Sequence, residues 1–320
     1  MRNPISAALA GALATRTSQE RPVTLTEADR ADGKVALVTG ANRGLGKAIA
    51  TQLAQRGARV IMACRSGIPE AGDDVARASG SRGIEMLPVD LGDLRSVVTL
   101  CTTLSEAKRA LDLVVLNAGV VPRSARPTTQ GFELMFGVNY LANVLLVERL
   151  LSLGVIRPDA KRPPRIVFVS SETHRDVGPV DFSTLGRFAP YDAMGSMKVY
   201  GYSKLLLEVY AADLARRLGR GASVHSLCPG AVDTDIAREA PEWVKPTLGL
   251  VMKKFFRAPA DAATPVTYLC CARELEGQTG RYLHAMVEKR AAGQTRDTSV
   301  GKRLLRDSER LIRAALGEAR

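Results

Sequence analysis

Tyr200 and Lys204 are the residues whose types and spacing can do acid–base chemistry. The apolar pattern from Val199 to Leu218 predicts a helix, and residues four apart on a helix share a face. A free tyrosine, with a pKa of about 10, is a poor acid–base group at neutral pH, but a nearby ammonium group favours the tyrosinate and lowers that pKa. The pair can therefore give a proton to a carbonyl oxygen that receives a hydride, or take one from an alcohol. Ser171, at the end of a predicted strand, can hydrogen-bond the same oxygen.

A glycine-rich turn, with the sequence TGANRGLG at residues 39–46, is a candidate phosphate site. Gly40 can make the tight turn out of a strand, Gly44 lets the backbone approach a pyrophosphate, and Gly46 lets the next helix lie close to the sheet. The N-terminus of that helix offers free N–H groups and a partial positive charge to phosphates. Because the turn follows the first predicted strand and opens the first predicted helix, it predicts a dinucleotide site rather than a structural turn.

The residue at the end of the second predicted strand separates NAD from NADP sites. An acid there binds the ribose 2′-hydroxyl, whereas an arginine accommodates a 2′-phosphate. In this chain Arg65 stands at the end of that strand and Arg43 lies in the glycine turn. Two guanidinium groups can flank a dianionic phosphate with bidentate hydrogen bonds, although arginines are also ordinary surface residues. Because no acid occupies the ribose position, the sequence predicts NADP(H) as the cofactor.

The elements that must position these groups alternate along the chain. Short apolar runs predict strands at residues 34–39, 59–64, 84–89, 111–116, 165–170 and 222–227, with a short seventh at 280–283. Strands that are apolar on both faces and joined by helices imply a parallel sheet covered on both sides, and right-handed crossovers make it doubly wound. The predicted fold class is therefore α/β, a single-domain Rossmann fold with about seven strands and helices on both faces. Such sheets bind ligands at the C-terminal ends of their strands.

The chain is predicted to divide into a core domain and two tails. Residues 33–287 form the dinucleotide-binding oxidoreductase domain, with a substrate lid at about 232–258, and residues 288–320 form a basic helical C-terminal tail. Residues 1–32 form an N-terminal extension, flexible or targeting. Its apolar run from Ile5 to Ala14 is too short to span a bilayer, which takes about 20 apolar residues. A targeting peptide, a membrane-surface helix and a frayed tail all remain open for it.

The composition narrows the partners and the compartment. A net charge of +12 raises the question of nucleic acid, but the chain has no nucleic-acid motif and no basic stripe interleaved with aromatic residues. Anionic cofactor phosphates, or an acidic membrane surface at its periphery, suit this charge better. The five cysteines lack the spacing of metal ligands, and three of them lie in apolar runs (Cys64, Cys228 and Cys270). They indicate a reducing compartment, cytoplasmic or organellar, and no metal site.

Taken in order, these residues resemble the classical short-chain dehydrogenase/reductase family over about residues 34–283. Each motif is weak alone, but the ordered set is specific. The matching positions are Gly40, Asn42, Arg43, Gly44, Leu45 and Gly46, then Asp90 and Leu91, then Asn117, Ala118 and Gly119, and finally Asn139, Ser171, Tyr200, Lys204, Pro229, Gly230, Val232 and Thr234.

The resemblance implies a role for each of these positions. Tyr200 would be the general acid–base, and Lys204 would hold the nicotinamide ribose and lower the pKa of Tyr200. Ser171 would orient the substrate oxygen, and Asn139 would support a proton relay through water. Of the cofactor-binding positions, Asp90 would lie near the adenine and residues 117–119 under the cofactor, with Pro229, Gly230 and Thr234 on the nicotinamide side.

Within the family the chain resembles the retinol-dehydrogenase-like branch, which includes the WW-domain oxidoreductase. The resembling segments are NRGLG at 42–46, ACR at 63–65, GFELMFGVN at 131–139 and VSSETH at 169–174. That branch usually has Asn-His-Leu-Gly-His where this chain has NYLAN at 139–143, so Ala142 and Asn143 depart from its pattern beside the substrate region. The resemblance also suggests dimer packing through the apolar helix expected at 132–151.

Two segments outside these motifs bear on the substrate. The segment from Glu242 to Phe256 carries the only tryptophan and should fold over the nicotinamide pocket, either as an apolar substrate tunnel that touches a membrane or as helices packed on the core. Residues 301–313 predict a basic amphipathic helix, which docks on the parent domain or contacts a membrane or a partner.

The function predicted from the sequence is that of an NADP(H)-dependent oxidoreductase. It would interconvert a carbonyl and an alcohol on an apolar substrate of the retinoid, steroid or lipid-aldehyde type. Two alternatives remain: a non-catalytic NADP-binding regulatory or scaffold protein, and a carbon–carbon double-bond reductase of the same family. The presence of all four of Asn139, Ser171, Tyr200 and Lys204 favours an enzyme over a scaffold.

Overall fold

The computed structural model describes residues 22–232 and 257–318. Strands and helices alternate over most of them, as predicted. The strands are β1 (Val35–Thr39), β2 (Arg59–Cys64), β3 (Ile84–Pro88), β4 (Leu113–Leu116), β5 (Arg165–Val169), β6 (Ser223–Cys228), β7 (Tyr282–His284) and β8 (Val287–Lys289). The main helices are α2 (Gly44–Gln55), α3 (Glu70–Ser79), α4 (Leu94–Glu106), α5 (Ala142–Ser152), α6 (Ala193–Leu218), α8 (Pro259–Cys271) and α9 (Thr298–Leu316).

All the strands above join one sheet in the order β3-β2-β1-β4-β5-β6-β7-β8. Neighbouring strands from β3 to β7 run parallel, and only the β7–β8 pair is antiparallel. The strand order turns outward in both directions from β1 and β4, which is the doubly wound topology, so the predicted fold class is confirmed.

The eighth strand was not predicted, and its turn explains why. His284 pairs with Val287 across a two-residue connection in which Ala285 adopts a φ of +53°. Tight hairpins are normally recognised in a sequence by Asn-Gly or Asp-Gly, because those residues tolerate a positive φ. Here an alanine holds that conformation, and the three residues of β8 are too few to show an alternating pattern.

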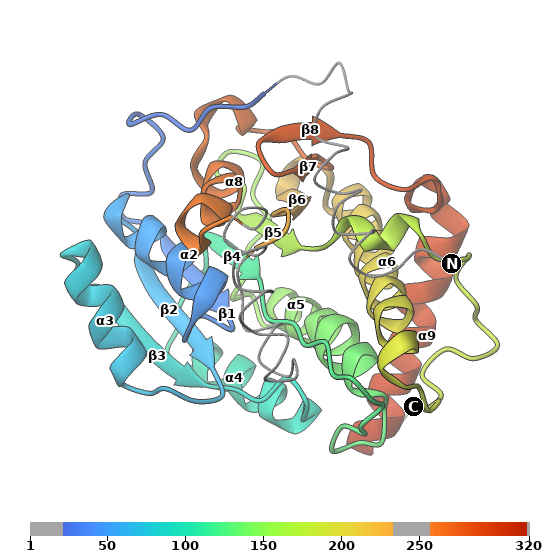
Figure 1. Cartoon of the computed structure of the whole chain (residues 1–320). Helices are drawn as coiled ribbons and strands as arrows, with labels where there is room; N and C mark the ends of the chain where they lie inside the picture. Colours follow the sequence, from blue (N-terminus) through green and yellow to red (C-terminus); the bar gives the residue numbers. More distant parts are fainter. Residues whose placement is uncertain (1–21, 233–256, 319–320) are drawn as a thin grey trace, which may run out of the picture.

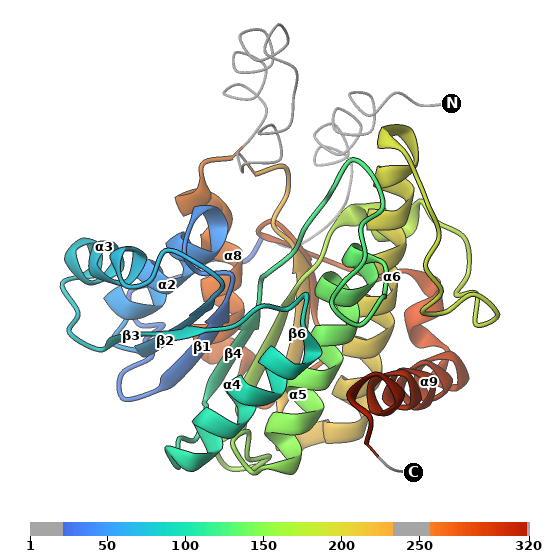
Figure 2. The same ribbon diagram turned by 90° about the horizontal axis from the view of Figure 1, so that it is seen from below.

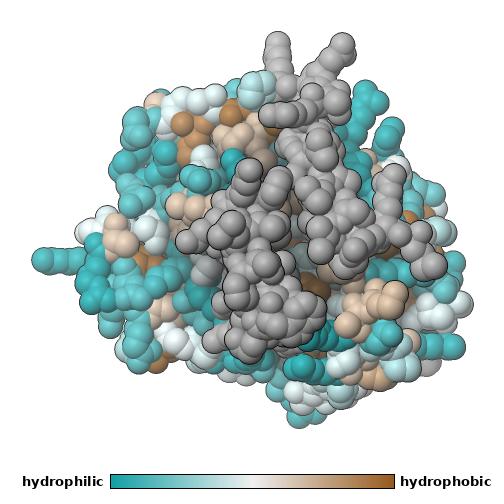
Figure 3. All heavy atoms as spheres, in the orientation of Figure 1, coloured by the Kyte–Doolittle hydropathy of each residue, from teal (hydrophilic) through white to brown (hydrophobic). Residues whose placement is uncertain are grey.

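Helices cover both faces of the sheet (Figure 1). Figure 2 shows α2, α3 and α8 on one side and α4, α5 and α6 on the other, with α9 outside α6. Two apolar clusters match these layers, one that includes Ile49, Val75 and Leu269, and one that includes Leu100, Leu146 and Leu206. On the face seen in Figure 3, hydrophilic residues dominate the coloured periphery, with hydrophobic ones in small separate areas.

Helix α9 packs on the domain through its apolar side. Leu304 and Ile312 are buried in the same cluster as α5 and α6, and the hydroxyl oxygens of Ser308 and Tyr140 lie 2.7 Å apart. The apolar character of the helix at 132–151 is therefore accounted for within the chain, and dimer packing through it stays a prediction. Within the described ranges, none of the helices combines the length and the hydropathy that a membrane span requires.

Two helix boundaries differ from those predicted. Helix α6 begins at Ala193, six residues before the apolar pattern, because the Asp192 side chain accepts hydrogen bonds from the N–H groups of Met194 and Gly195 and so caps it. The predicted helix at 132–151 is a π-helix, η1 (Phe136–Leu141), followed directly by α5. The predicted lid lies almost wholly outside the described residues, as does Thr234.

Candidate active site

The glycine turn leaves β1 at the sheet edge where the strand order diverges. Gly40 has a φ of +64°, and a Cβ atom there would lie 3.0 Å from the Cα of Ala118. A Cβ at Gly46 would lie 2.2 Å from the carbonyl oxygen of Gly40 and 2.5 Å from Nδ2 of Asn117. Only glycine therefore lets α2 start this close to the ends of β1 and β4, as the sequence predicts.

A threonine hydroxyl joins the glycine turn to the segment that follows β4. Oγ1 of Thr39 accepts hydrogen bonds from the N–H groups of Asn117 and Ala118, at 3.0 and 3.1 Å, and the Asn117 side chain donates to the carbonyl of Thr39 at 2.9 Å. The Thr39 side chain is fully buried. These bonds hold residues 117–119 beside the turn, where the family resemblance expects the floor of a cofactor site.

The N-terminus of α2 suits a phosphate. The residue before it, Arg43, is extended, no side chain of the described residues caps the helix, and its first turn carries no acid. Its first N–H groups thus point out of the helix without a side-chain acceptor, and the helix dipole adds positive potential there. Together with a turn whose close approach excludes any Cβ, this arrangement fits the pyrophosphate of a dinucleotide.

The adenosine end of the predicted site contains basic and small polar residues. Arg65 is largely exposed, and its Nη1 lies 3.9 Å from a carboxylate oxygen of Asp90. The Asn42 side chain donates to the Ser66 hydroxyl at 3.4 Å and ties the glycine turn to the end of β2. Leu91 is buried next to Asp90. No carboxylate stands at the end of β2 itself, the position where an acid would bind a ribose 2′-hydroxyl.

Asn139 lies in the π-helix and is fully buried. Its Oδ1 accepts from the N–H of Val120 at 2.8 Å, and its Nδ2 donates to the Val120 carbonyl at 3.0 Å and to Oγ of Ser203 at 3.1 Å. A Cβ at Gly119 would lie 3.4 Å from Oδ1 of Asn139 and 3.6 Å from Nζ of Lys204. The asparagine therefore connects the segment after β4 to α6, and it brings the predicted site residues of three elements together.

Tyr200 and Lys204 occupy one face of α6, opposite the end of β5. The Lys204 Nζ lies 5.6 Å from the centroid of the Tyr200 ring and donates a hydrogen bond to the carbonyl of Val169 at 2.8 Å. Ser171 follows β5 directly and is close enough to Tyr200 to hydrogen-bond its phenol. The structure thus groups Asn139, Ser171, Tyr200 and Lys204 around the ends of β4 and β5.

The electrostatics of the pair differ from the sequence expectation. Burial lowers the pKa of Lys204 to about 8. The charges of Glu208 and, less strongly, of Cys228 raise the pKa and so oppose this effect. Burial raises the pKa of Tyr200 above its ordinary value, and the charge of Cys228 adds to this effect. A hydrogen bond with Ser171 lowers the pKa. The net shift of the Tyr200 pKa is therefore upward in this arrangement, and the lowering of that pKa by the Lys204 ammonium stays a prediction. At neutral pH the phenol keeps its proton and can donate it.

Known proteins resemble this chain over most of its length. The family model described as short chain dehydrogenase matches residues 34–182. Human retinol dehydrogenase 14 is 36% identical over 298 residues, which cover 88% of this chain and 86% of that protein. The chain belongs to the short-chain dehydrogenase/reductase family. It is retinol-dehydrogenase-like, and mouse polyprenol dehydrogenase is 37% identical over 303 residues, 90% of this chain and 86% of the relative.

Solved structures share the fold of this chain. An uncharacterized protein from Mycobacterium paratuberculosis superposes with a TM-score of 0.67 at 26% identity, over 91% of this chain and 98% of that one. The complex of RhlG from Pseudomonas aeruginosa with NADP superposes with a TM-score of 0.61 at 25% identity, over 81% and 97% of the two chains. The single sheet with helices on both faces is therefore the fold of a short-chain dehydrogenase.

The segment after β6 carries further positions that the family resemblance predicts for the cofactor site. Pro229 and Gly230 follow the strand, and Gly230 has a φ of +86°, which only glycine adopts readily. Val232 is buried and pairs with Arg257, where the described chain resumes. A Cβ at Gly230 would lie 3.5 Å from Cδ of Arg257. The predicted cofactor position Thr234 lies outside the described residues.

Two site-building residues were missed as such by the sequence analysis. Ser203 accepts from Asn139 and donates to the Tyr200 carbonyl at 2.7 Å, so it holds α6 against the π-helix. Asn143, noted only as a departure, donates from Nδ2 to the carbonyls of Val138 and Asn139, at 3.2 and 3.0 Å. The signal for Ser203 was its place next to Lys204. No metal-binding group of acids, histidines and cysteines occurs in residues 22–232 and 257–318.

Proposed function

We propose that this short-chain dehydrogenase is an NADP(H)-dependent oxidoreductase that interconverts a carbonyl and an alcohol on a long apolar substrate. The observation that carries the proposal is the grouping of Tyr200, Lys204, Ser171 and Asn139 beside a glycine turn with an uncapped helix N-terminus. A proton donor and a dinucleotide site at one sheet edge are the two parts that hydride transfer to a carbonyl requires.

Each end of the cofactor has residues suited to it. The turn at residues 40–46 and the N-terminus of α2 would hold the pyrophosphate, and Arg43 and Arg65 would favour a 2′-phosphate over a free hydroxyl. When bound, the nicotinamide supplies or accepts the hydride. The NADP complex of RhlG, a structural relative, supports the choice of NADP(H) over NAD(H).

The chain's own side chains handle the proton. Tyr200 donates from its phenol to the substrate oxygen in reduction and accepts from the alcohol in oxidation. Ser171 fixes that oxygen beside the phenol, and Lys204, 5.6 Å from the ring centroid, stabilises the tyrosinate left after donation. Asn139 holds the segment after β4 and α6 in this register through its bonds to Val120 and Ser203.

The substrate class follows from the relatives and from the surface near Tyr200. Retinol and polyprenol, which give two relatives their names, are both long apolar alcohols. Met197 lies one helical turn before Tyr200, on the same side of α6, and is exposed; Met194 at the start of α6 and Phe188 in the segment before it are exposed as well. Flexible apolar side chains at this point suit a hydrocarbon chain better than a polar substrate.

The test is a screen of the purified protein with NADPH against retinal, a polyprenal, steroid ketones, fatty aldehydes and quinones, followed by variants. We expect Tyr200→Phe to lower kcat by on the order of 100-fold or more, the usual share of general acid catalysis, and to leave the Kd for NADPH unchanged. Tyr202→Phe is the matched control, because the Tyr202 hydroxyl accepts from the N–H of Asp181 in an outer loop. Near-normal turnover of Tyr200→Phe would refute the assignment.

A further inference from the structure

A buried carboxylate lies behind the candidate active site. Glu208 follows Lys204 by one turn of α6 and is only 2% exposed. Its Oε2 accepts a hydrogen bond from the Ser226 hydroxyl at 2.8 Å, whereas its Oε1 has no partner among the described residues. A buried carboxylate with a free oxygen is costly, so this group calls for an explanation beyond packing.

Two more unpartnered polar atoms belong to the same region. Oγ of Ser170 and Nε2 of His174 are both buried without a hydrogen bond in the described part of the chain. Nδ1 of His174 lies 2.6 Å from the Ser171 carbonyl, which can only accept, so Nδ1 carries a proton. In a neutral His174, Nε2 is then an acceptor. A serine, a histidine and a carboxylate with free positions are what a buried water or a mobile proton requires.

The protonation equilibria of Glu208 and Lys204 approach each other. Burial raises the pKa of Glu208, against the opposing effects of His174, Ser226, Ser170 and Lys204. Burial lowers the pKa of Lys204 to about 8. Cys228 of β6 and Tyr282 of β7 also interact with Glu208, and burial raises the pKa of both, so they stay neutral at neutral pH; the charged residues Arg216, Arg281, Glu288, Lys289 and Arg296 line the cavity with it. Proton exchange between the lysine and the carboxylate therefore costs less than it would in water.

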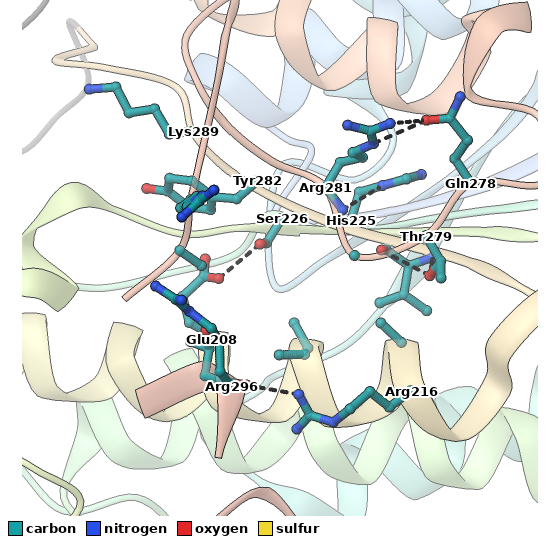
Figure 4. A pocket seen from close by; sticks show the side chains of 18 of the residues that line it. Glu208, Arg216, His225, Ser226, Gln278, Thr279, Arg281, Tyr282, Lys289 and Arg296 are labelled. Atoms are coloured by element: carbon teal, nitrogen blue, oxygen red, sulfur yellow. Dashed lines mark hydrogen bonds between the residues drawn. The ribbon is translucent and has the colours of Figure 1, made fainter. Parts of the chain in front are cut away.

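A cavity of about 900 Å³ links this region to the surface (Figure 4). It lies between α6 and strands β6 and β7, and both Glu208 and Ser226 line it. Along α6 it is bounded by the small side chains of residues 211, 212 and 215, all alanines, and exposed residues such as Arg216 and Arg296 lie at its rim. A space of this size, with charged and hydroxyl groups such as those of Glu208, Ser226 and Arg281 in a mostly apolar lining, admits water up to the Glu208 carboxylate.

A second route for protons, through water at Asn139, is partly blocked by the Asn143 side chain. The family resemblance implies a relay through water at Asn139. In this chain the Asn139 carbonyl accepts a hydrogen bond from the Asn143 side chain at 3.0 Å, and Asn143 is buried. One lone pair of that oxygen is thus used within the chain rather than by water.

We propose that Glu208 carries protons between Lys204 and the water of this cavity, and so connects the active site to solvent through the interior of the α6 layer. The inference rests on the proposed function. In reduction the Tyr200 phenol gives its proton to the substrate oxygen and becomes a tyrosinate. The Lys204 ammonium gives a proton to the tyrosinate oxygen, the Glu208 carboxylic acid restores the ammonium through water that the cavity admits, and cavity water returns one proton to the carboxylate. These steps transfer protons only and involve no oxidation or reduction. In the oxidation of an alcohol they run in reverse.

The test separates the first turnover from the later ones. Glu208→Gln keeps the size and the hydrogen bond with Ser226 but cannot carry a proton as an acid. We expect NADPH oxidation in the first turnover to stay within about 2-fold of wild type, because Tyr200 starts out protonated, and kcat to fall by on the order of 10-fold or more. Stopped flow should show a burst of one equivalent, a larger solvent isotope effect on kcat, and partial recovery of kcat with added formate, a small acid that fits the cavity.

Two further variants distinguish proton transfer from structure. Ala212→Leu should narrow the cavity and lower kcat with the same burst while it leaves the Glu208 acid itself in place, and it keeps the test available if Glu208→Gln does not fold. Ser226→Ala removes the bond to Oε2 but keeps the acid, so it should retain kcat within about 3-fold. An unchanged kcat in Glu208→Gln or in Ala212→Leu, or an equal loss in the first and later turnovers, overturns the relay. Absence of any NADPH oxidation by wild type overturns the proposed function as well.

Discussion

Replacing Gly46 by alanine tests the dinucleotide turn at its tightest point. The new Cβ would lie 2.2 Å from the Gly40 carbonyl oxygen and 2.5 Å from Nδ2 of Asn117, whereas ordinary contacts begin at 3.4 Å. Relief of this overlap requires a shift of about 1 Å between α2 and the end of β1. Overpacking of this kind costs about 1–3 kcal/mol. Because the shift moves the N-terminus of α2 away from the phosphates, the same perturbation should weaken NADPH.

Isothermal titration and thermal unfolding measure the two effects. A loss of 1.4 kcal/mol in binding is tenfold in Kd, so we expect the Kd for NADPH to rise by about 10- to 100-fold. The Tm should fall by about 2–4 °C for each kcal/mol lost from the stability of the fold. Gly293→Ala is the control, because a Cβ there meets no described atom within 4 Å, and it should change neither quantity measurably. Wild-type affinity and Tm in Gly46→Ala would refute the close approach of α2 to β1.

Two further outcomes follow from charge. Arg65→Ala should raise the Kd for NADPH by about tenfold or more and leave that for NADH within about 2-fold, because one bidentate contact to a 2′-phosphate is lost; equal weakening in titrations of both cofactors would contradict the assignment. His225→Gln should flatten the pH dependence of stability in acid. Burial, together with the charges of Arg165 and Arg281, lowers the pKa of His225 to about 3. Between about pH 6.5 and 3 the unfolded chain therefore binds one proton more than the folded protein. The stability of the wild type then falls as the pH falls, by up to about 1.4 kcal/mol per pH unit. Denaturant titrations at several pH values should show that slope reduced in the variant, and identical slopes would contradict the burial of a neutral histidine.

Local signals in the sequence determined the order of the elements and most of the candidate site. The buried strands are apolar on both faces, and the glycines at 40 and 46 stand where backbone approach excludes a Cβ, so pattern and spacing were enough to predict the sheet and the phosphate turn. Tyr200 and Lys204 could be paired from helical spacing alone, since both lie within one turn of α6.

Only the tertiary structure decided how these groups interact, because burial and direction depend on distant segments. The pKa of Tyr200 is raised because neighbouring elements shield its half-buried phenol from water, while Lys204 is directed at a carbonyl of β5. The unpartnered oxygen of Glu208 and the cavity beside it arise where α6 meets β6 and β7, strands that lie far along the chain from one another. Helical and strand periods specify which face of an element is apolar, but they do not specify which polar atoms lack a partner once the faces meet.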